Sequence, residues 1–396
     1  MKDKVRDVLM AIDAHLQSSK LAGAGLLTGN AGVALFYNEL YAFTGEERYL
    51  DICVDRITKS VDALGISGTP YSFCNGFAGV GWVVDRIMKS GIIEKSEELF
   101  DEIENKLFLV GRSEIQKGRY DFLHASGGVA LLALSRLPRE NAKKFLENFV
   151  RELSAVKTRD ETGVKWKDLI SENKDDAPIY GLGLSHGVPS VVMMLLKIFH
   201  AGICQEQIAP IVEKSVTWIL SAKLESGKYN SVYPNFISAK RNIGPSRLSW
   251  CYGDLGLAIM FSFAGATFKN ELWIQESKML LQHSLTRLDP LQDPTLDAGV
   301  CHGTAGIAFL FKILGTITGN EDCYKVRDFW IAETLKFAKP GQNPLIKFYR
   351  PETDDPWIEK LGVLEGMAGV GLVLLDYLNG NSYSSVLKET LLLNLE

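Results

Sequence analysis

The sequence lacks the features of a membrane-spanning or nucleic-acid-binding protein. Its continuous apolar stretches, such as VVMMLL (191–196), are far shorter than the roughly 20 residues needed to cross a bilayer. No run is dense in Lys or Arg, and the net charge at pH 7 is −5, which argues against a nucleic-acid surface. The N-terminal MKDKVRDVLMAIDAHL carries acidic residues and is typical of an amphipathic helix rather than a signal peptide. We therefore expect neither membrane insertion nor a nucleic-acid partner.

Cysteines are few and scattered. Six occur in 396 residues, without the dense framework of a disulfide-stapled protein or the close Cys-x-x-Cys pairs of zinc fingers and ribbons. This usage favours the reducing cytoplasm, where thiols serve as ligands, nucleophiles or core residues. Hydrophobic residues make up 46% and charged residues 23% of the chain, as in an ordinary globular protein.

A short turn of small residues followed by an apolar run recurs seven times. The copies begin at residues 29, 76, 125, 187, 253, 303 and 366, and GTAGIAFL (303–310) is representative. Each interval between copies can hold two helices of ordinary length. Spacings this long indicate repeated supersecondary units, and strand signals between them are sparse.

The repeat predicts an all-α fold. Its apolar runs are nearly continuous, which is typical of buried helices, whereas the intervening segments are more charged and read as amphipathic helices. An open solenoid would need polar capping repeats, yet the last copy, LEGMAGVGLVLLDYL, is as apolar as the middle ones. We therefore predict a closed α/α toroid (barrel) of seven inner and seven outer helices, formed by one domain over residues 1–396.

Two cysteines and two histidines occupy equivalent repeat positions. Cys251 and Cys301 lie two residues before the first Gly of their turns, and His186 and His302 lie one residue before it. If all turns face one end of a ring, these side chains converge there. Two thiolates and one imidazole, from Cys251, Cys301 and His302, suit zinc with one coordination position left open. Taken singly, each is as easily a buried core residue; the shared position favours a metal site.

The motifs SWCYGDLG (249–256), VCHGTAGIA (300–308) and GLSHGVPS (183–190) resemble those of the lanthionine synthetase C-like family, the cyclases of lantibiotic biosynthesis, in its stand-alone form. The resemblance covers nearly the whole chain and implies an α/α toroid with one central zinc ion. It places the zinc ligands on Cys251, Cys301 and His302.

The resemblance also implies four catalytic residues. The acid/base pair falls on His186 and Asp121, the active-site arginine on Arg247 and the tyrosine on Tyr252. Asp121 would orient the imidazole or take the thiol proton, and Arg247 would hold Asp121 or an enolate oxygen. Without the resemblance, Asp121 reads as a helix N-cap, Arg247 as part of an ion pair and Tyr252 as an ordinary buried phenol.

Some positions depart from the family pattern. Pro189 and Ser190 stand where a second small Gly is usual in the His186 turn. His124 lies three residues after Asp121 and is either a second proton carrier or a residue of the pocket wall. We expect Cys74, which shares the two-before position, to be a core or wall thiol, since a fourth thiolate would close the zinc site.

The family's reaction is an intramolecular Michael addition, in which a precursor-peptide cysteine adds to dehydroalanine or dehydrobutyrine and forms a (methyl)lanthionine ring. The implied partners are a dehydrated precursor peptide and a separate dehydratase, with an export transporter and recruitment to the membrane by partners left open. One alternative is a zinc- and glutathione-binding relative that adds thiols or acts as an adaptor without forming rings. Another is an unrelated α/α toroid, either a glycoside hydrolase with paired carboxylates or a zinc prenyltransferase.

Overall fold

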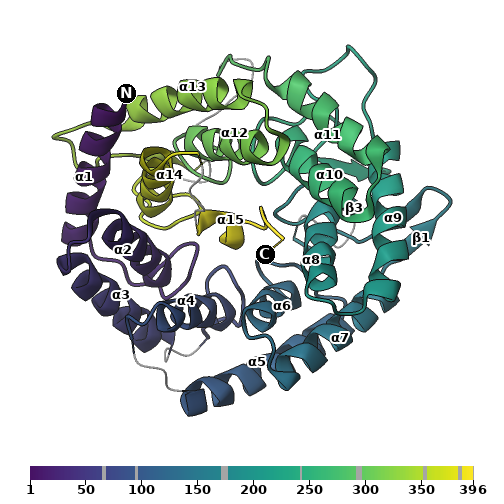
Figure 1. Cartoon of the computed structure of the whole chain (residues 1–396), viewed down its shortest axis with the longest axis horizontal. Helices are drawn as coiled ribbons and strands as arrows, with labels where there is room; N and C mark the ends of the chain where they lie inside the picture. The colour runs from purple at the N-terminus through teal and green to yellow at the C-terminus, as the bar shows by residue number, and fades with distance from the viewer. Residues whose placement is uncertain are drawn as a thin grey trace. The chain divides into compact units, whose positions relative to one another are not determined.

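The computed structural model describes most of the chain and is almost wholly helical there (Figure 1). The described residues are 1–64, 68–93, 97–170, 177–240, 243–290, 297–350, 355–381 and 386–395. Fifteen helices and six short strands lie within these ranges. The predicted all-α class is therefore confirmed.

Seven apolar helices begin directly after the first small residue of the seven repeated turns. They are α2 (Asn30–Thr44), α4 (Phe77–Lys89), α6 (Ser126–Ser135), α8 (Val188–His200), α10 (Asp254–Phe268), α12 (Thr304–Thr318) and α14 (Met367–Asn379). In α8, 11 of the 13 residues are buried, as expected for a helix that is apolar most of the way round. The repeat thus predicted the start of each of these helices.

Amphipathic helices alternate with the apolar ones. They are α1 (Lys2–Ser18), α3 (Arg48–Leu64), α5 (Glu97–Gln116), α7 (Glu140–Ala155), α9 (Gln205–Ser221), α11 (Glu271–Ser284) and α13 (Asp322–Phe337), and a short α15 (Leu387–Thr390) follows α14. In α3 only five of 17 residues are buried, and Tyr49, Cys53 and Ile57 among them follow one another at helical spacing. One face of α3 therefore packs on the core while the other meets solvent.

Three two-stranded antiparallel sheets lie in the connections between helices. They pair β1 (Thr158–Asp160) with β2 (Gly163–Lys165), β3 (Ile179–Gly181) with β4 (Phe236–Ser238), and β5 (Phe348–Tyr349) with β6 (Trp357–Ile358). Tyr180 lies opposite Ile237 in the second sheet. Because β3 runs directly into the turn of His186, this sheet fixes where that turn begins.

The small residues of the turns are required by the path of the backbone. A Cβ on Gly306 would lie 1.9 Å from the carbonyl oxygen of Val300, and one on Gly32 would lie 2.0 Å from that of Leu26. At the starts of α2, α4, α6, α12 and α14 the preceding loop folds back, so its carbonyls accept the first backbone N–H groups; Thr304 N, for example, donates to Asp297 O. This backbone capping replaces side-chain caps, and a side chain at the second Gly would displace it.

The helices form two compact units. The first unit comprises Met1–Leu107, Leu296–Phe309 and Arg327–Leu387, and in it α2 packs against α3, α4 and α14. The second unit comprises Phe108–Thr295, Leu310–Val326 and Lys388–Glu396. There α6, α8 and α10 lie side by side, and α7, α9 and α11 cover them on one side (Figure 1).

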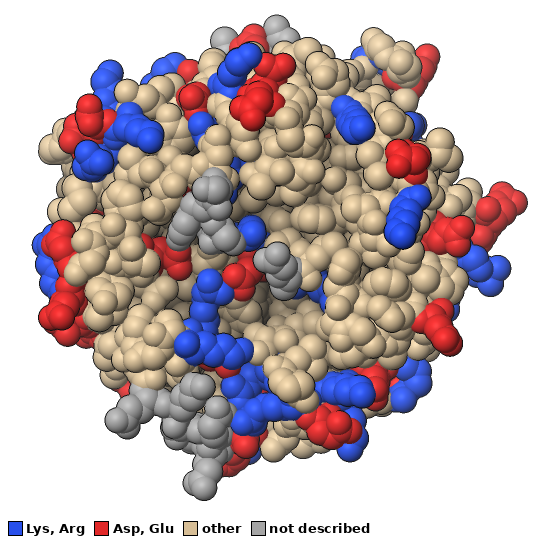
Figure 2. Space-filling model, in the orientation of Figure 1, with Lys and Arg blue, Asp and Glu red and all other residues tan. Residues whose placement is uncertain are grey.

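No helix within the described ranges is long and apolar enough to cross a membrane. On the face drawn in Figure 2, Lys and Arg side chains are interspersed with Asp and Glu.

Candidate active site and metal centre

In the second unit, Cys251 lies in the loop that leads into α10. Its side chain is buried, and its Sγ lies 3.5 Å from Ser249 Oγ. The Ser249 hydroxyl donates to the carbonyl oxygen of Tyr252 at 2.6 Å. The indole N–H of Trp250 donates to Leu391 O at 2.9 Å, so the residues on both sides of the thiol are fixed.

The turn that carries His186 is hydrogen bonded to this cysteine loop. The backbone N–H and the hydroxyl of Ser185 both donate to the carbonyl oxygen of Cys251, at 3.3 and 3.1 Å. A Cβ on Gly183 would lie 1.8 Å from the same oxygen. Only a glycine allows the two loops to approach this closely, and the contact sets His186 beside Cys251.

His186 and Asp121, which are 65 residues apart in the sequence, form a close pair. The imidazole Nδ1 donates to Asp121 Oδ2 at 2.7 Å, and the backbone N–H of His124 donates to Asp121 Oδ1 at 2.8 Å. Asp121 is buried, with 6% exposure. The residue at the N-cap of α6 is Ala125, not Asp121. The Asp121 carboxylate therefore does not cap the helix, and it binds the backbone of the turn and the imidazole.

The surroundings of His186 favour its protonated form. Burial by itself would lower the pKa of the imidazole, because it disfavours the charged form. The hydrogen bond and negative charge of Asp121, followed by the smaller influences of Asp168 and Cys251, outweigh burial and raise the pKa above its usual value. The net effect of these neighbours is to favour the imidazolium form of His186.

Tyr252 is held by a carboxylate that the sequence motifs do not contain. Its hydroxyl donates to Asp168 Oδ2 at 3.1 Å, while Asp168 Oδ1 accepts the N–H of Ile170 at 3.0 Å. Asp168 is only 1% exposed. This buried acid therefore fixes the phenol and adds negative potential near His186.

Arg247 does not make the contact that the resemblance suggests. Its side chain, which is half-buried, has no hydrogen bond or ion pair with any residue in the described ranges. The two oxygens of Asp121 are taken by His124 and His186. Two roles were expected for Arg247. The structure shows no bond between Arg247 and Asp121, and the binding of an enolate oxygen stays a prediction.

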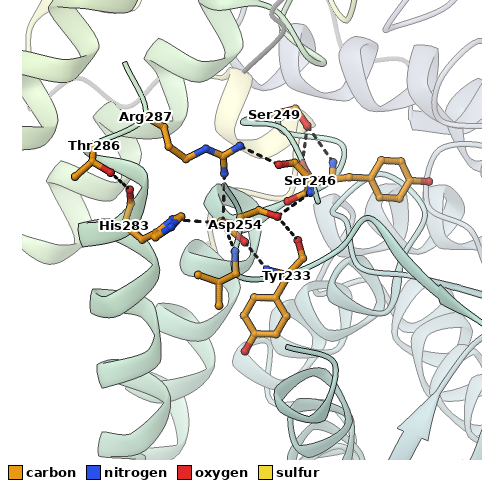
Figure 3. Close-up of polar contacts among 10 residues, drawn as sticks. Tyr233, Ser246, Ser249, Asp254, His283, Thr286 and Arg287 are labelled. Atoms are coloured by element: carbon orange, nitrogen blue, oxygen red, sulfur yellow. Dashed lines mark hydrogen bonds and ion pairs between the residues drawn. The ribbon is translucent and has the colours of Figure 1, made fainter. Parts of the chain in front are cut away.

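A buried polar network fixes the start of α10, directly after the Cys251 loop (Figure 3). The carboxylate of Asp254 is fully buried and accepts the backbone N–H groups of Val232 and Tyr233 at 2.9 and 3.0 Å. Arg287 Nη1 lies 3.4 Å from the same carboxylate, and its Nη2 donates to Ser246 O at 2.9 Å. Burial raises the pKa of Asp254, while the two N–H groups and Arg287 oppose that rise.

We predict that Asp254→Ala lowers the free energy of unfolding by about 3–5 kcal/mol, because it leaves a buried guanidinium and two buried N–H groups without their carboxylate. Urea denaturation of the folded protein measures this change. The matched control is Asp322→Ala, since Asp322 is also the first residue of its helix but its side chain is 61% exposed. A loss for Asp254→Ala as small as the control's, within about 1 kcal/mol, would contradict the network's role.

Cys301 and His302 lie in the first unit, in the turn before α12. The backbone N–H groups of Val300 and Cys301 both donate to Leu364 O, at 3.0 and 2.9 Å. His302 Nδ1 lies 3.9 Å from Glu365 Oε1, and Lys360 Nζ lies 2.7 Å from Glu365 Oε2. A carboxylate beside a ligating imidazole commonly fixes its orientation, so Glu365 is suited to orient His302.

The cysteines fall into distinct environments. Cys53 and Cys323 are completely buried, and burial raises the pKa of each thiol to about 12, as in inert core residues. Cys251 and Cys301 retain 7% and 8% exposure. Two sets of three side chains among the described residues could hold a metal ion, and Cys251, Cys301 and His302 all belong to them.

Cys74 belongs to neither of these sets. It is buried, and its Sγ donates to Asn75 Oδ1 at 3.1 Å. This environment agrees with the expectation of a core or wall thiol.

Residues 21–389 match the model of the lanthionine synthetase C-like proteins. The chain belongs to this family. The membership decides against the alternative of an unrelated toroid.

Two curated relatives match along most of their length. Nisin biosynthesis protein NisC of Lactococcus lactis subsp. lactis is 22% identical over 381 residues, covering 88% of this chain and 84% of the relative. Glutathione S-transferase LANCL1 of Danio rerio is 23% identical over 401 residues, covering 96% and 88%. The solved structure of a nisin cyclase superposes with a TM-score of 0.77 at 18% identity, covering 99% of this chain and 97% of the other. That similarity confirms the predicted helical toroid.

Asp168 and Glu365 are candidate site residues that the sequence analysis missed. A sequence pattern could have revealed Glu365. The residue just before the first small residue of each turn is polar in all seven repeats: Thr28, Asn75, His124, His186, Tyr252, His302 and Glu365. Asp168 lies outside the repeated turns, and nothing in its sequence surroundings sets it apart from a surface aspartate.

Proposed function

We propose that this protein is a zinc-dependent lanthipeptide cyclase. It adds the cysteine thiol of a precursor peptide to a dehydroalanine or dehydrobutyrine of the same peptide and forms a (methyl)lanthionine thioether. The observation that carries the proposal is the Asp121–His186 pair, which Ser185 fastens to the loop of Cys251. Family membership and the similarity to a nisin cyclase support the same reaction.

Cys251, Cys301 and His302 would hold the zinc ion. Two thiolates and an imidazole are borderline-soft donors that zinc prefers, and three protein ligands leave one position for the substrate. Zinc would supply one thing to the reaction, the deprotonation of the substrate thiol, whose ordinary pKa of ~8.5 leaves it mostly protonated at neutral pH. The proton released to water balances the one that His186 later delivers. Glu365 would keep the His302 ring in its ligating orientation.

The protein residues would handle the remaining proton and charge. The substrate sulfur forms a bond to Cβ of the dehydro residue, the C=C π bond breaks, and negative charge moves onto the neighbouring carbonyl as an enolate. His186 then delivers a proton to Cα, because its raised pKa keeps it protonated near neutral pH. Asp121 orients this imidazole. Arg247, on the same loop as Cys251, would bind the enolate oxygen, and Tyr252 would contribute a phenol oxygen that Asp168 holds in place.

The proposed partners and location follow from this reaction. A cyclase needs a peptide that has already lost water from serine or threonine, so a separate dehydratase must act first. The chain would work in the cytoplasm, with an export transporter and recruitment to a membrane as further proposals. Residues 1–396 would act as one domain.

A synthetic peptide with one dehydroalanine and one cysteine tests the proposal. The addition is an isomerisation, so the peptide should lose its free thiol, read by maleimide labelling, without any change in mass. The zinc-loaded protein should produce this change and a metal-stripped sample should not. If the thiol persists under conditions where the protein is folded and holds zinc, ring formation is wrong.

The matching relative named a glutathione S-transferase supports a second candidate function, addition of glutathione to dehydro residues. The same assay separates the two when glutathione is included with a peptide that lacks cysteine. A product heavier by one glutathione, with no ring formed in the cysteine peptide, would favour the second candidate.

We predict that Asp168→Asn slows cyclisation about 10- to 100-fold, because a hydrogen bond to a charged group contributes roughly 1.5–3 kcal/mol. Turnover is compared for Asp168→Asn, Tyr252→Phe and the double variant. If Asp168 acts through the phenol, the double variant should be little worse than Tyr252→Phe alone. Fully multiplicative losses would mean that Asp168 has no positioning role on Tyr252.

A further inference from the structure

Asp121, His124 and His186 form a cluster of metal-binding side chains within the second unit. One ligand atom from each of the three lies within 4.8 Å of the other two. The rings of His124 and His186 stack with centroids 5.5 Å apart and planes 17° from parallel. The proposed reaction uses Asp121 and His186, and it leaves His124 without a function.

We propose that this cluster is a second, inhibitory zinc site. The inference rests on the proposed function, because zinc here would occupy the imidazole that donates the proton. The occupant would be a free divalent ion taken up beyond the first equivalent, bound by Asp121, His124 and His186.

The donor set suits zinc. Two imidazoles and one carboxylate are the ligands of many open zinc sites, in which water fills the fourth position. Asp121 supplies negative charge from a buried carboxylate, so the ion would be partly neutralised. The pair distance of 2.7 Å between Asp121 Oδ2 and His186 Nδ1 needs only a small widening to admit an ion at ligand distances near 2.0–2.2 Å.

His124 is available and accessible as a ligand. A neutral imidazole has a free lone pair, which metal binding requires, and the stacking of His124 on His186 holds the ring within reach of the other two ligands. Its side chain is exposed, so an ion can enter from solvent without unfolding the turn.

Binding here and proton delivery by His186 exclude each other. A metal-bound imidazole cannot hold the proton that it should give to the enolate, and the ion would also take the carboxylate that orients the ring. Zinc at one equivalent would therefore support cyclisation, and further zinc would inhibit it.

The test counts zinc ions by competition with a chromophoric chelator on tag-free protein that already holds one zinc. We expect wild type to bind a second zinc. His124→Asn should weaken that second site by more than about 100-fold, the upper end of the cost of losing an outer-shell partner, and leave the first unchanged. The matched control is His200→Asn; His200 is another histidine of the second unit, at the end of α8, and hydrogen bonds to Thr267. This control should keep both sites.

Cobalt provides a second measurement on unmodified protein. The first cobalt equivalent should give an intense sulfur-to-metal charge-transfer band, and the second should add only the weak bands of nitrogen and oxygen ligation. The cyclisation rate at excess zinc is divided by the rate of the same protein at one zinc per chain. This ratio should fall well below one in wild type and much less in His124→Asn.

Three results would overturn the second site: a stoichiometry that stops at one zinc, a second zinc that binds equally well to His124→Asn, or a sulfur band that grows with the second cobalt. None of these requires cyclase activity, so failure of this site is distinguishable from failure of the proposed function. A protein that binds two zinc ions as described but forms no thioether would retain the site and lose the reaction.

Discussion

Cys301→Ala should lose its zinc and its cyclase activity together. Removing one of three protein ligands leaves two donors, too few for a stable site, and without zinc the substrate thiol stays mostly protonated at neutral pH. We expect zinc content, measured by elemental mass spectrometry, to fall from about one ion per chain to nearly none. Cys251→Ala should behave in the same way, since the proposed site uses both thiolates.

Cys74→Ser is the matched control for this experiment. Cys74 is also a buried thiol two residues before a repeated turn, but it bonds to Asn75 and belongs to neither possible metal-binding set. Its substitution should leave zinc content and cyclisation unchanged. Zinc loss in Cys74→Ser would mean that the ligand set is misassigned, and full cyclisation by Cys301→Ala would refute the proposed mechanism.

His186→Asn should keep its zinc but cyclise about 10²- to 10⁴-fold more slowly, the usual contribution of a positioned general acid. Asparagine can still hydrogen bond to Asp121 but cannot deliver a proton at neutral pH. Turnover of the dehydrated peptide and zinc content are measured on the same preparation. Unchanged turnover would remove His186 from the acid role, and loss of zinc would show that the turn as a whole had been disturbed.

The pH dependence of the rate distinguishes positioning from proton transfer. Asp121 raises the pKa of His186 against the effect of burial, and in the proposed mechanism the protonated imidazole is the active form. Asp121→Asn removes that support, so the pKa of His186 should fall and the alkaline limb of the rate profile should move to lower pH. A profile that keeps its alkaline limb would indicate that another group donates the proton.

The repeat shows why helix positions can be predicted here. The close approach of Val300 O to Gly306 is a constraint between residues six apart, and the same spacing recurs in the turns before α2, α4 and α14, so it leaves a trace in the sequence. The alternation of apolar and amphipathic helices is similarly local, and it led to the correct fold class. The single domain over residues 1–396 and the ligand set Cys251, Cys301 and His302 stay predictions.

The sequence by itself determined where seven helices begin, which residues precede them and which family the chain resembles, because each of these depends on neighbours within a few positions. Only the tertiary structure decided that Asp121 pairs with His186, 65 residues away, and that Asp168 accepts the hydroxyl proton of Tyr252, 84 residues away. It likewise decided that Arg247 makes no contact with Asp121. These pairings depend on how α6, α8 and α10 pack together with the loops that precede them. Contacts between residues so far apart in the chain produce no periodic pattern in the sequence. Burial, which raises the pKa of Asp254 and by itself would lower that of His186, likewise exists only once the chain has folded.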